Sequence, residues 1–196
     1  MSNLSDGLRS TLIDVARLAV LSAVHSTPAH DPVPDAFPEP LQIRRATFVT
    51  LRARDELRGC CGTLEPRRAL VLDVWMSARA AASEDRRFEP LRPAELEDLE
   101  LEICVLTPLT RLEVANQHEL LAQIQPGTDG LYLKLGARRA TFLPKVWESL
   151  PERTQFLRQL KIKAGLEDRF WSSEIEWFRY GAESFGAHFS TAATCH

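Results

Sequence analysis

The sequence predicts an α+β fold in which antiparallel sheets are flanked by helices. Two pairs of alternating segments, at residues 44–64 and 131–143, are typical of β-hairpins. Segments with helical periodicity lie between and around them, at irregular intervals. Hairpins and helices that alternate irregularly favour antiparallel pairing over a repeated strand–helix–strand unit. With 196 residues, of which 44% are hydrophobic, the chain is long enough to bury a core.

The first predicted element is an amphipathic helix over residues 5–24, which Ser5 or Asp6 caps. Its apolar face recurs at helical spacing: Leu8, Leu12, Val15, Ala16 and Ala19. Prolines then stand at positions 28, 32, 34, 38 and 40. Because proline disrupts helices, we expect residues 26–40 to form an extended surface arm.

A hairpin follows, with strands at 44–51 and 57–64 around the polar turn 53–56. Residues 67–83 have a strong helical pattern. Because this helix begins soon after the second strand, we expect its positive N-terminal end to lie beside that strand.

The second half of the chain mixes short elements. Residues 99–106 alternate as a strand, so Glu100 and Glu102 share the face opposite the apolar residues. The other predicted elements are a short helix from Pro93, a helix at 118–124, a hairpin at 131–135 and 139–143, helices at 144–149 and 152–164, and a last strand at 174–180. Residues 186–196 form an irregular tail without a clear pattern.

Composition narrows the class of protein. The formal net charge is −3 and the basic residues are scattered, so nucleic acid is not an expected partner. No apolar run is long enough to span a membrane, and the N-terminus lacks the basic start of a signal peptide. We therefore expect a cytoplasmic protein with reduced cysteines.

The most informative segment is residues 57–63, in which Cys60 and Cys61 stand between Gly59 and Gly62. Glycines allow a sharp turn and the close approach of another molecule. A guanidinium at Arg58 would favour a thiolate at Cys60. The simpler alternative is that Cys60 is a small buried apolar residue, as free cysteines often are.

Strand alternation places Cys60 and Cys61 on opposite faces, so we expect Cys61 to be a packing residue. A metal site is not predicted, because zinc-binding cysteines are usually separated by two to four residues. No cofactor is predicted. Residues 85–88 are expected to form a structural ion pair that ties a helix end to the sheet.

The motif Arg58-Gly59-Cys60-x-Gly62-Thr63, with the Leu64-Glu65-Pro66 that follows it, resembles the signature of the AMMECR-one domain family. Further stretches agree with the family in order and spacing, at residues 80–91, 99–108, 129–147 and 163–171. The similarity runs from about residue 8 to about residue 185. The chain is thus identified as a single domain, 1–196, of this family.

The resemblance implies an α+β fold of two unequal lobes with a cleft between them. It is greatest to the bacterial AmmeMemoRadiSam system, which implies association with a Memo-like protein and a radical S-adenosylmethionine (radical SAM) protein. The matched signature positions are Arg58, Gly59, Cys60, Gly62, Thr63 and Glu102. The chain departs from the family where Cys61 replaces an aliphatic residue and Cys104 replaces a serine.

Two functions remain open. The first is an enzyme, or an enzyme subunit, that uses Cys60 as a nucleophile or redox thiol on a small molecule or peptide. Glu102 would act as general acid or base, or hold Arg58 in place. Arg58, Thr63 and the amides around Gly59 and Gly62 would bind an anionic group of the substrate. The second is a non-catalytic module that docks a partner through residues 58–63, the Memo-like and radical SAM proteins being the candidates.

Overall fold

The computed structural model describes residues 4–27 and 29–189 of the chain. Two compact units make up the protein. The first contains the chain up to Leu106 and the chain from Glu183 onward, and the second is Thr107–Ala182. Each unit has its own four-stranded antiparallel sheet and its own helices, which confirms the predicted α+β class.

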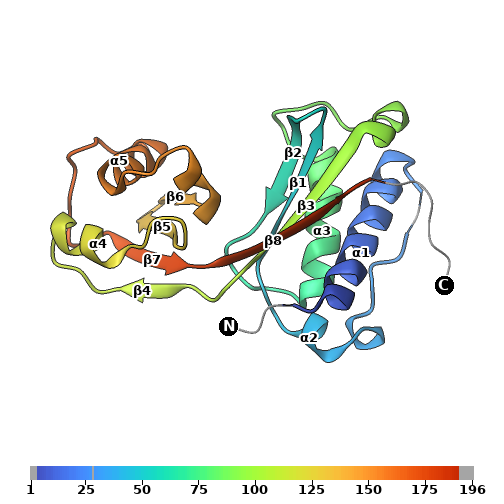
Figure 1. Ribbon diagram of the computed structural model, residues 1–196, viewed down its shortest axis with the longest axis horizontal. Helices are drawn as coiled ribbons and strands as arrows, with labels where there is room; N and C mark the ends of the chain where they lie inside the picture. The colour runs from blue at the N-terminus through green and yellow to red at the C-terminus, as the bar shows by residue number, and fades with distance from the viewer. Residues whose placement is uncertain (1–3, 28, 190–196) are drawn as a thin grey trace. The chain divides into compact units, whose positions relative to one another are not determined.

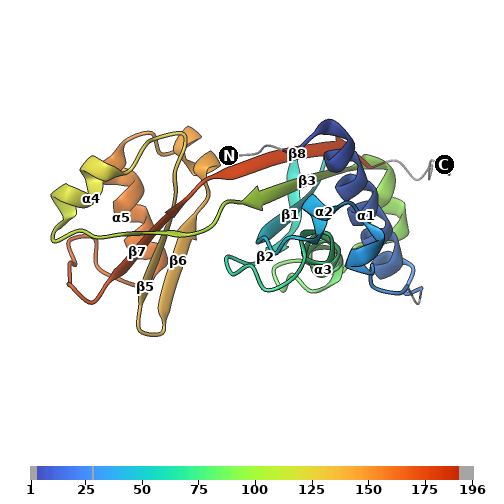
Figure 2. The ribbon, with the colours of Figure 1, turned by 90° about the horizontal axis from the view of Figure 1, so that it is seen from below.

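The first unit is a sheet covered by helices on one face (Figures 1 and 2). Its strand order is β2-β1-β3-β8, so β2 and β8 are the edges. The strands are β1 (Thr47–Ala53), β2 (Glu56–Gly62), β3 (Leu99–Leu106) and β8 (Ala182–His188). The long helices α1 (Asp6–Val24) and α3 (Leu70–Ser83) pack against each other and against this sheet.

Sequence periodicity decides which face of this sheet is buried. In β1, Val49 and Leu51 are fully buried against the helices, while Thr50 and Arg52, which alternate with them, point the other way. Leu101 and Ile103 continue the apolar face on β3. The predicted helix start is confirmed, because the Ser5 hydroxyl accepts the N–H of Leu8.

The hairpin of β1 and β2 forms as predicted, with a two-residue turn at Arg54 and Asp55. Both residues have positive φ, 52° and 65°, which matches the twist of the flanking strands. The register shifts in β2, because Leu51 pairs with Gly59 whereas Arg52 pairs with Leu57. Arg58 is therefore the extra residue of a β-bulge.

The proline-rich arm contains helical turns that the sequence analysis did not predict. A 3₁₀ turn, η1, spans Pro34–Ala36, and a one-turn helix, α2, spans Glu39–Gln42. Each has proline in its first two positions, where the missing N–H has no intrahelical acceptor and costs nothing. The arm is held on α3 by Asp31, which accepts a hydrogen bond of 2.9 Å from Trp75 Nε1.

The second unit has strand order β4-β7-β5-β6. Its strands are β4 (Thr110–Leu112), β5 (Gly130–Leu135), β6 (Arg138–Phe142) and β7 (Glu176–Tyr180), and its helices are α4 (Gln117–Gln123) and α5 (Arg153–Lys163). A 3₁₀ helix, η3 (Pro144–Glu148), stands where a helix was predicted. The core includes a stacked pair of rings, Trp147 and Phe156, with centroids 3.7 Å apart. The short strand β4 was not predicted.

Lys161 is fully buried in the second unit. Its Nζ donates to Gln117 Oε1 at 2.6 Å and to the carbonyl of Asp168 at 3.3 Å, and it lies over the Trp171 ring. Burial lowers the pKa of this ammonium group. These contacts tie α5 to α4 and to the loop that precedes β7.

The prediction of an irregular tail from residue 186 is wrong for its first part, since β8 runs to His188. Gly186 lies directly against the Leu101–Glu102 backbone of β3, so this strand depends on pairing more than on local pattern. Residues 190–196 of the expected tail lie outside the described residues. Within the described residues, no helix has both the length and the apolar character that crossing a bilayer requires.

Candidate functional site

The face of the first sheet opposite α1 and α3, here called the open face, brings the two predicted catalytic residues onto one surface. Thr50 of β1 is the register partner of Cys60 on β2 and of Glu102 on β3. The three side chains therefore form one cross-strand row, in which Thr50 Oγ1 donates to Cys60 Sγ at 3.4 Å. Because adjacent strands are about 4.8 Å apart, Cys60 and Glu102 flank the threonine on either side.

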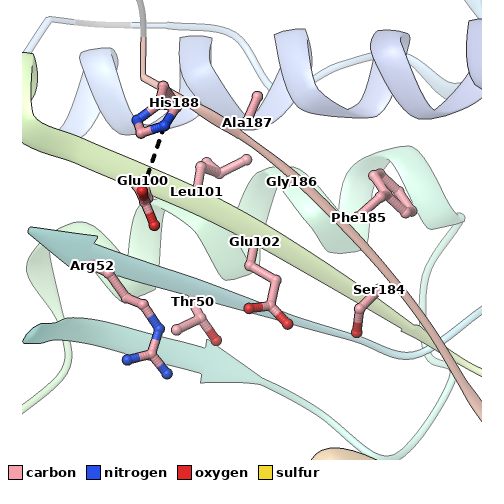
Figure 3. A pocket seen from close by; sticks show the side chains of 10 residues that line it. All are labelled: Thr50, Arg52, Glu100, Leu101, Glu102, Ser184, Phe185, Gly186, Ala187 and His188. Atoms are coloured by element: carbon pink, nitrogen blue, oxygen red, sulfur yellow. Dashed lines mark ion pairs between the residues drawn. The ribbon is translucent and has the colours of Figure 1, made fainter. Parts of the chain in front are cut away.

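A cavity of about 430 Å³ lies on the open face. Figure 3 shows Thr50, Arg52, Glu102 and Ser184 pointing to the same side of the sheet. The wall is completed by β8, the last strand, from Ser184 to His188. Sequence analysis found Glu102 here and missed Ser184 and His188, because the strand that carries them was not predicted.

Charged groups of both signs line this cavity. Glu100 is the register partner of Arg52, and its Oε1 lies 3.6 Å from His188 Nε2. The Glu100 side chain is 42% exposed, as expected for a solvated face. A ligand on the open face therefore meets carboxylates, a guanidinium and an imidazole within one site.

Arg58 is not available as a free cation. Its Nε donates to Glu95 Oε1 at 2.7 Å and its Nη2 to Glu95 Oε2 at 3.2 Å, and the guanidinium also lies over the Phe88 ring. The bulge at Arg58 interrupts strand alternation and re-aims this side chain. Glu95, rather than Glu102, therefore holds Arg58.

The glycines of the motif serve packing within the chain. A Cβ on Gly59 would overlap the carbonyl oxygen of Ala81, in the last turn of α3. A Cβ on Gly62 would overlap the backbone of Thr47 and Phe48. The molecule that approaches these glycines closely is thus the chain itself. Thr63 accepts the N–H of Glu65 through its hydroxyl, in the turn that leads toward α3.

The expectation that the positive N-terminal end of α3 lies beside β2 is wrong. Its last turn packs against Gly59, and Ala80 and Glu84 border the same cavity as Cys60. The negative C-terminal end of this helix, rather than its positive end, therefore lies closest to Gly59. The chain reverses direction between β2 and α3, which carries the first turn of the helix away from Cys60.

Asp85 ties the helix end to the sheet, as the sequence predicted for residues 85–88. Its Oδ2 accepts the backbone N–H of Cys60 at 2.9 Å and Nη2 of Arg87 at 2.7 Å. The hydrogen bond from Arg87 is the main reason why the pKa of Asp85 lies well below its usual range. The side chain is only 8% exposed, so the carboxylate is a fixed part of the site.

Two further cysteines that the structure describes in the first unit, Cys61 and Cys104, occupy packing positions. Cys61 is the register partner of the fully buried Val49 and joins the core beneath the helices. Burial, followed by the charge of Asp85, raises the pKa of its thiol to about 11, so Cys61 is neutral at physiological pH. Cys104 is buried opposite Phe48. Within the described ranges, no three His, Cys, Asp or Glu side chains converge as metal ligands.

Comparison with other proteins gives consistent results. The AMMECR1 family matches residues 13–185, which span parts of both units. A protein of Methanothermobacter thermautotrophicus is 35% identical over 181 residues, covering 89% of this chain and 92% of the relative. A protein of Methanopyrus kandleri is 36% identical over 183 residues, covering 89% and 86%.

A solved structure supports the same assignment. The crystal structure of uncharacterized protein PH0010 from Pyrococcus horikoshii matches with a TM-score of 0.85 and 28% sequence identity. The match covers 95% of this chain and 94% of the other. Both the sequence and the fold therefore agree along most of the molecule, and the chain belongs to the AMMECR1 family.

Proposed function

We propose that the chain binds a small molecule or peptide on the open face and that Cys60 attacks it as a nucleophilic thiol. The observation that carries this proposal is the cross-strand row of Cys60, Thr50 and Glu102, of which Thr50 and Glu102 also line the open-face cavity. A nucleophile, a hydroxyl donor and a carboxylate then meet one ligand on a rigid sheet.

In the proposed reaction, the Cys60 thiol adds to an electrophilic carbonyl carbon of the ligand. A bond forms between Sγ and the carbon, and the π electrons of the carbonyl move to its oxygen. Because Thr50 separates Cys60 from Glu102, the thiol proton passes to the Glu102 carboxylate through one bridging water molecule, and the carboxylate returns it by the same path to that oxygen. Thr50, already donating to Sγ, stabilises the negative charge that develops on sulfur during transfer. Because Arg58 is bound to Glu95, the carboxylate rather than a guanidinium is given the activating role.

Alkylation tests this assignment without a known substrate. The folded chain is treated with iodoacetamide at several pH values, and the modified cysteine is identified by mass spectrometry. Cys60 is expected to react, and Glu102→Gln is expected to slow the reaction. Glu56→Gln is the control, because Glu56 is exposed on the same strand as Cys60 and lies outside the open-face cavity. A Cys60 that does not react in the folded protein, or equal rates in both glutamate variants, would reject the proposal.

A binding module that uses the same face is the second candidate. Arg58, the Cys60 N–H and the Thr63 hydroxyl already bind other groups of the chain, so the partner is expected to contact side chains of the open face instead. The Memo-like and radical SAM proteins implied by the family resemblance are the partners to test. A complex that survives Cys60→Ser and is lost on Glu100→Arg would favour this function over catalysis.

A further inference from the structure

A second cavity, of about 690 Å³, lies along the edge strand β2 and the adjoining face of α3. Residues of the motif border it, together with side chains of α3 and of the loop before it. Its polar lining includes Arg68, Arg79, Ser77, Thr63 and Cys61. None of these residues lines the open-face cavity, although Cys60 of the cross-strand row also borders the second cavity.

Two arginines place positive charge in the wall of this second cavity. Arg79 is half-buried on α3, and its guanidinium makes no hydrogen bond or ion pair with any residue that the structure describes. Arg68 is 44% exposed, and its Nη1 lies 3.8 Å from Asp73 Oδ1, beyond hydrogen-bond distance. Both guanidinium groups therefore retain donors for a ligand.

The other polar groups of the cavity are neutral donors and two carboxylates. Ser77 carries a nearly buried hydroxyl, and the Cys61 thiol is neutral at physiological pH. Of the two acidic residues in the wall, Asp31 is already bound to Trp75 through its Oδ1. The other, Glu84, is exposed to solvent at the end of α3.

We infer that this cavity binds a small molecule whose oxyanion groups, phosphate or carboxylate, are contacted by Arg68 and by Arg79. A guanidinium binds either group through paired N–H donors, and a partly desolvated pair of guanidinium groups favours a ligand with two or more negative charges. The cavity has the volume of a small-molecule site, so the oxyanion is one part of a larger ligand. The inference concerns binding alone and does not depend on the chemistry of Cys60.

Isothermal titration of the full chain with pyrophosphate, and separately with citrate, tests this site. We expect saturable binding of at least one probe, weakened by added salt. Saturation by pyrophosphate alone assigns a phosphoryl group, and saturation by citrate alone assigns a carboxylate. Arg79→Ala and Arg68→Ala are each expected to weaken binding by about tenfold or more, since a hydrogen bond to a charged group is lost.

Arg86→Ala is the matched control, because Arg86 is exposed in the loop after α3 and lies outside the cavity. Its affinity is expected to equal that of the wild type. Arg79→Gln keeps much of the side-chain volume and provides a second variant if Arg79→Ala does not fold. Absence of saturation with both probes, or equal losses in the Arg79 and Arg86 variants, would overturn the inference.

Discussion

The carboxylate of Asp85 accepts the backbone N–H of Cys60, with 2.9 Å between Oδ2 and N. On an edge strand, this N–H would otherwise be open to pairing with another chain. A peptide that added to β2 as a further strand would have to displace this carboxylate, which Arg87 also holds. The contact therefore disfavours strand addition at Cys60 and favours recognition through side chains.

Asp85→Asn is expected to destabilise the first unit by about 2 kcal/mol at neutral pH, because the hydrogen bonds that residue 85 accepts from Cys60 and Arg87 lose the contribution of its negative charge. The pKa of Asp85 is lowered by folding, so its contribution is present above about pH 4 and is lost as the pH falls. Urea unfolding from pH 7 down to pH 3 measures the difference. A constant gap between wild type and variant would contradict the role of the charge.

Arg58→Ala separates structural from catalytic roles for this arginine. Since its guanidinium binds Glu95 and lies over Phe88, we expect a loss of about 1–3 kcal/mol in stability. The pH profile of Cys60 alkylation is expected to stay that of the wild type. Glu95→Gln is the matched variant, because it weakens the same pair from the other side. A shifted alkylation profile in Arg58→Ala alone would restore the predicted activation of Cys60.

The contribution of Asp73 to stability is expected to depend on pH in the opposite direction to that of Asp85. It is fully buried, and its Oδ2 accepts from the N–H and the hydroxyl of Thr47. Burial outweighs these hydrogen bonds and raises its pKa above the usual range. The stability it contributes is therefore complete below about pH 4 and is lost as the pH rises through the raised value.

Asp73→Asn keeps an acceptor for Thr47 and removes the titration. Relative to this variant, the wild type is expected to lose stability as the pH rises from about 4 toward neutrality. Chemical unfolding of both proteins at four or five pH values makes the comparison. A relative stability that rises over this interval would show that the carboxylate is stabilised as an anion.

Gly59→Ala tests the close approach of β2 and α3. The added methyl group overlaps the carbonyl oxygen of Ala81, which is backbone and cannot move aside, so a loss of about 3 kcal/mol is expected. Gly7→Ala is the control, because a Cβ there meets no atom and alanine favours a helix. Thermal unfolding of both variants suffices. A Gly59→Ala protein as stable as the wild type would mean that the contact is loose.

Local sequence pattern predicted most of the fold because most helices and strands can be recognised from their own residues. The helix α1 has a cap and an apolar stripe, and the hairpin of β1 and β2 has a polar turn between alternating segments. Elements without such a signal were missed. The strand β8 is specified by pairing with β3, and the turns in the proline-rich arm depend on proline at the first helical positions.

The candidate site was predicted in part for a similar reason. Alternation assigned Cys60 and Glu102 to strand faces correctly, and the register then joined them through Thr50. The bulge at Arg58 was not predicted, because a bulge is a property of the paired strands and not of one segment. Arg68 and Arg79 were not selected, since their approach to the motif depends on how α3 packs on β2.

The strand order of the first unit bears on how the protein is made. Its sheet closes with β8, a segment separated from β3 by the whole of Thr107–Ala182. During synthesis, the second unit therefore leaves the ribosome before the first can complete its sheet. Truncation before Glu183 would remove one wall of the open-face cavity and expose the edge of β3. Premature termination is thus expected to yield an aggregation-prone chain, even when every residue of the Arg58-to-Thr63 motif is present.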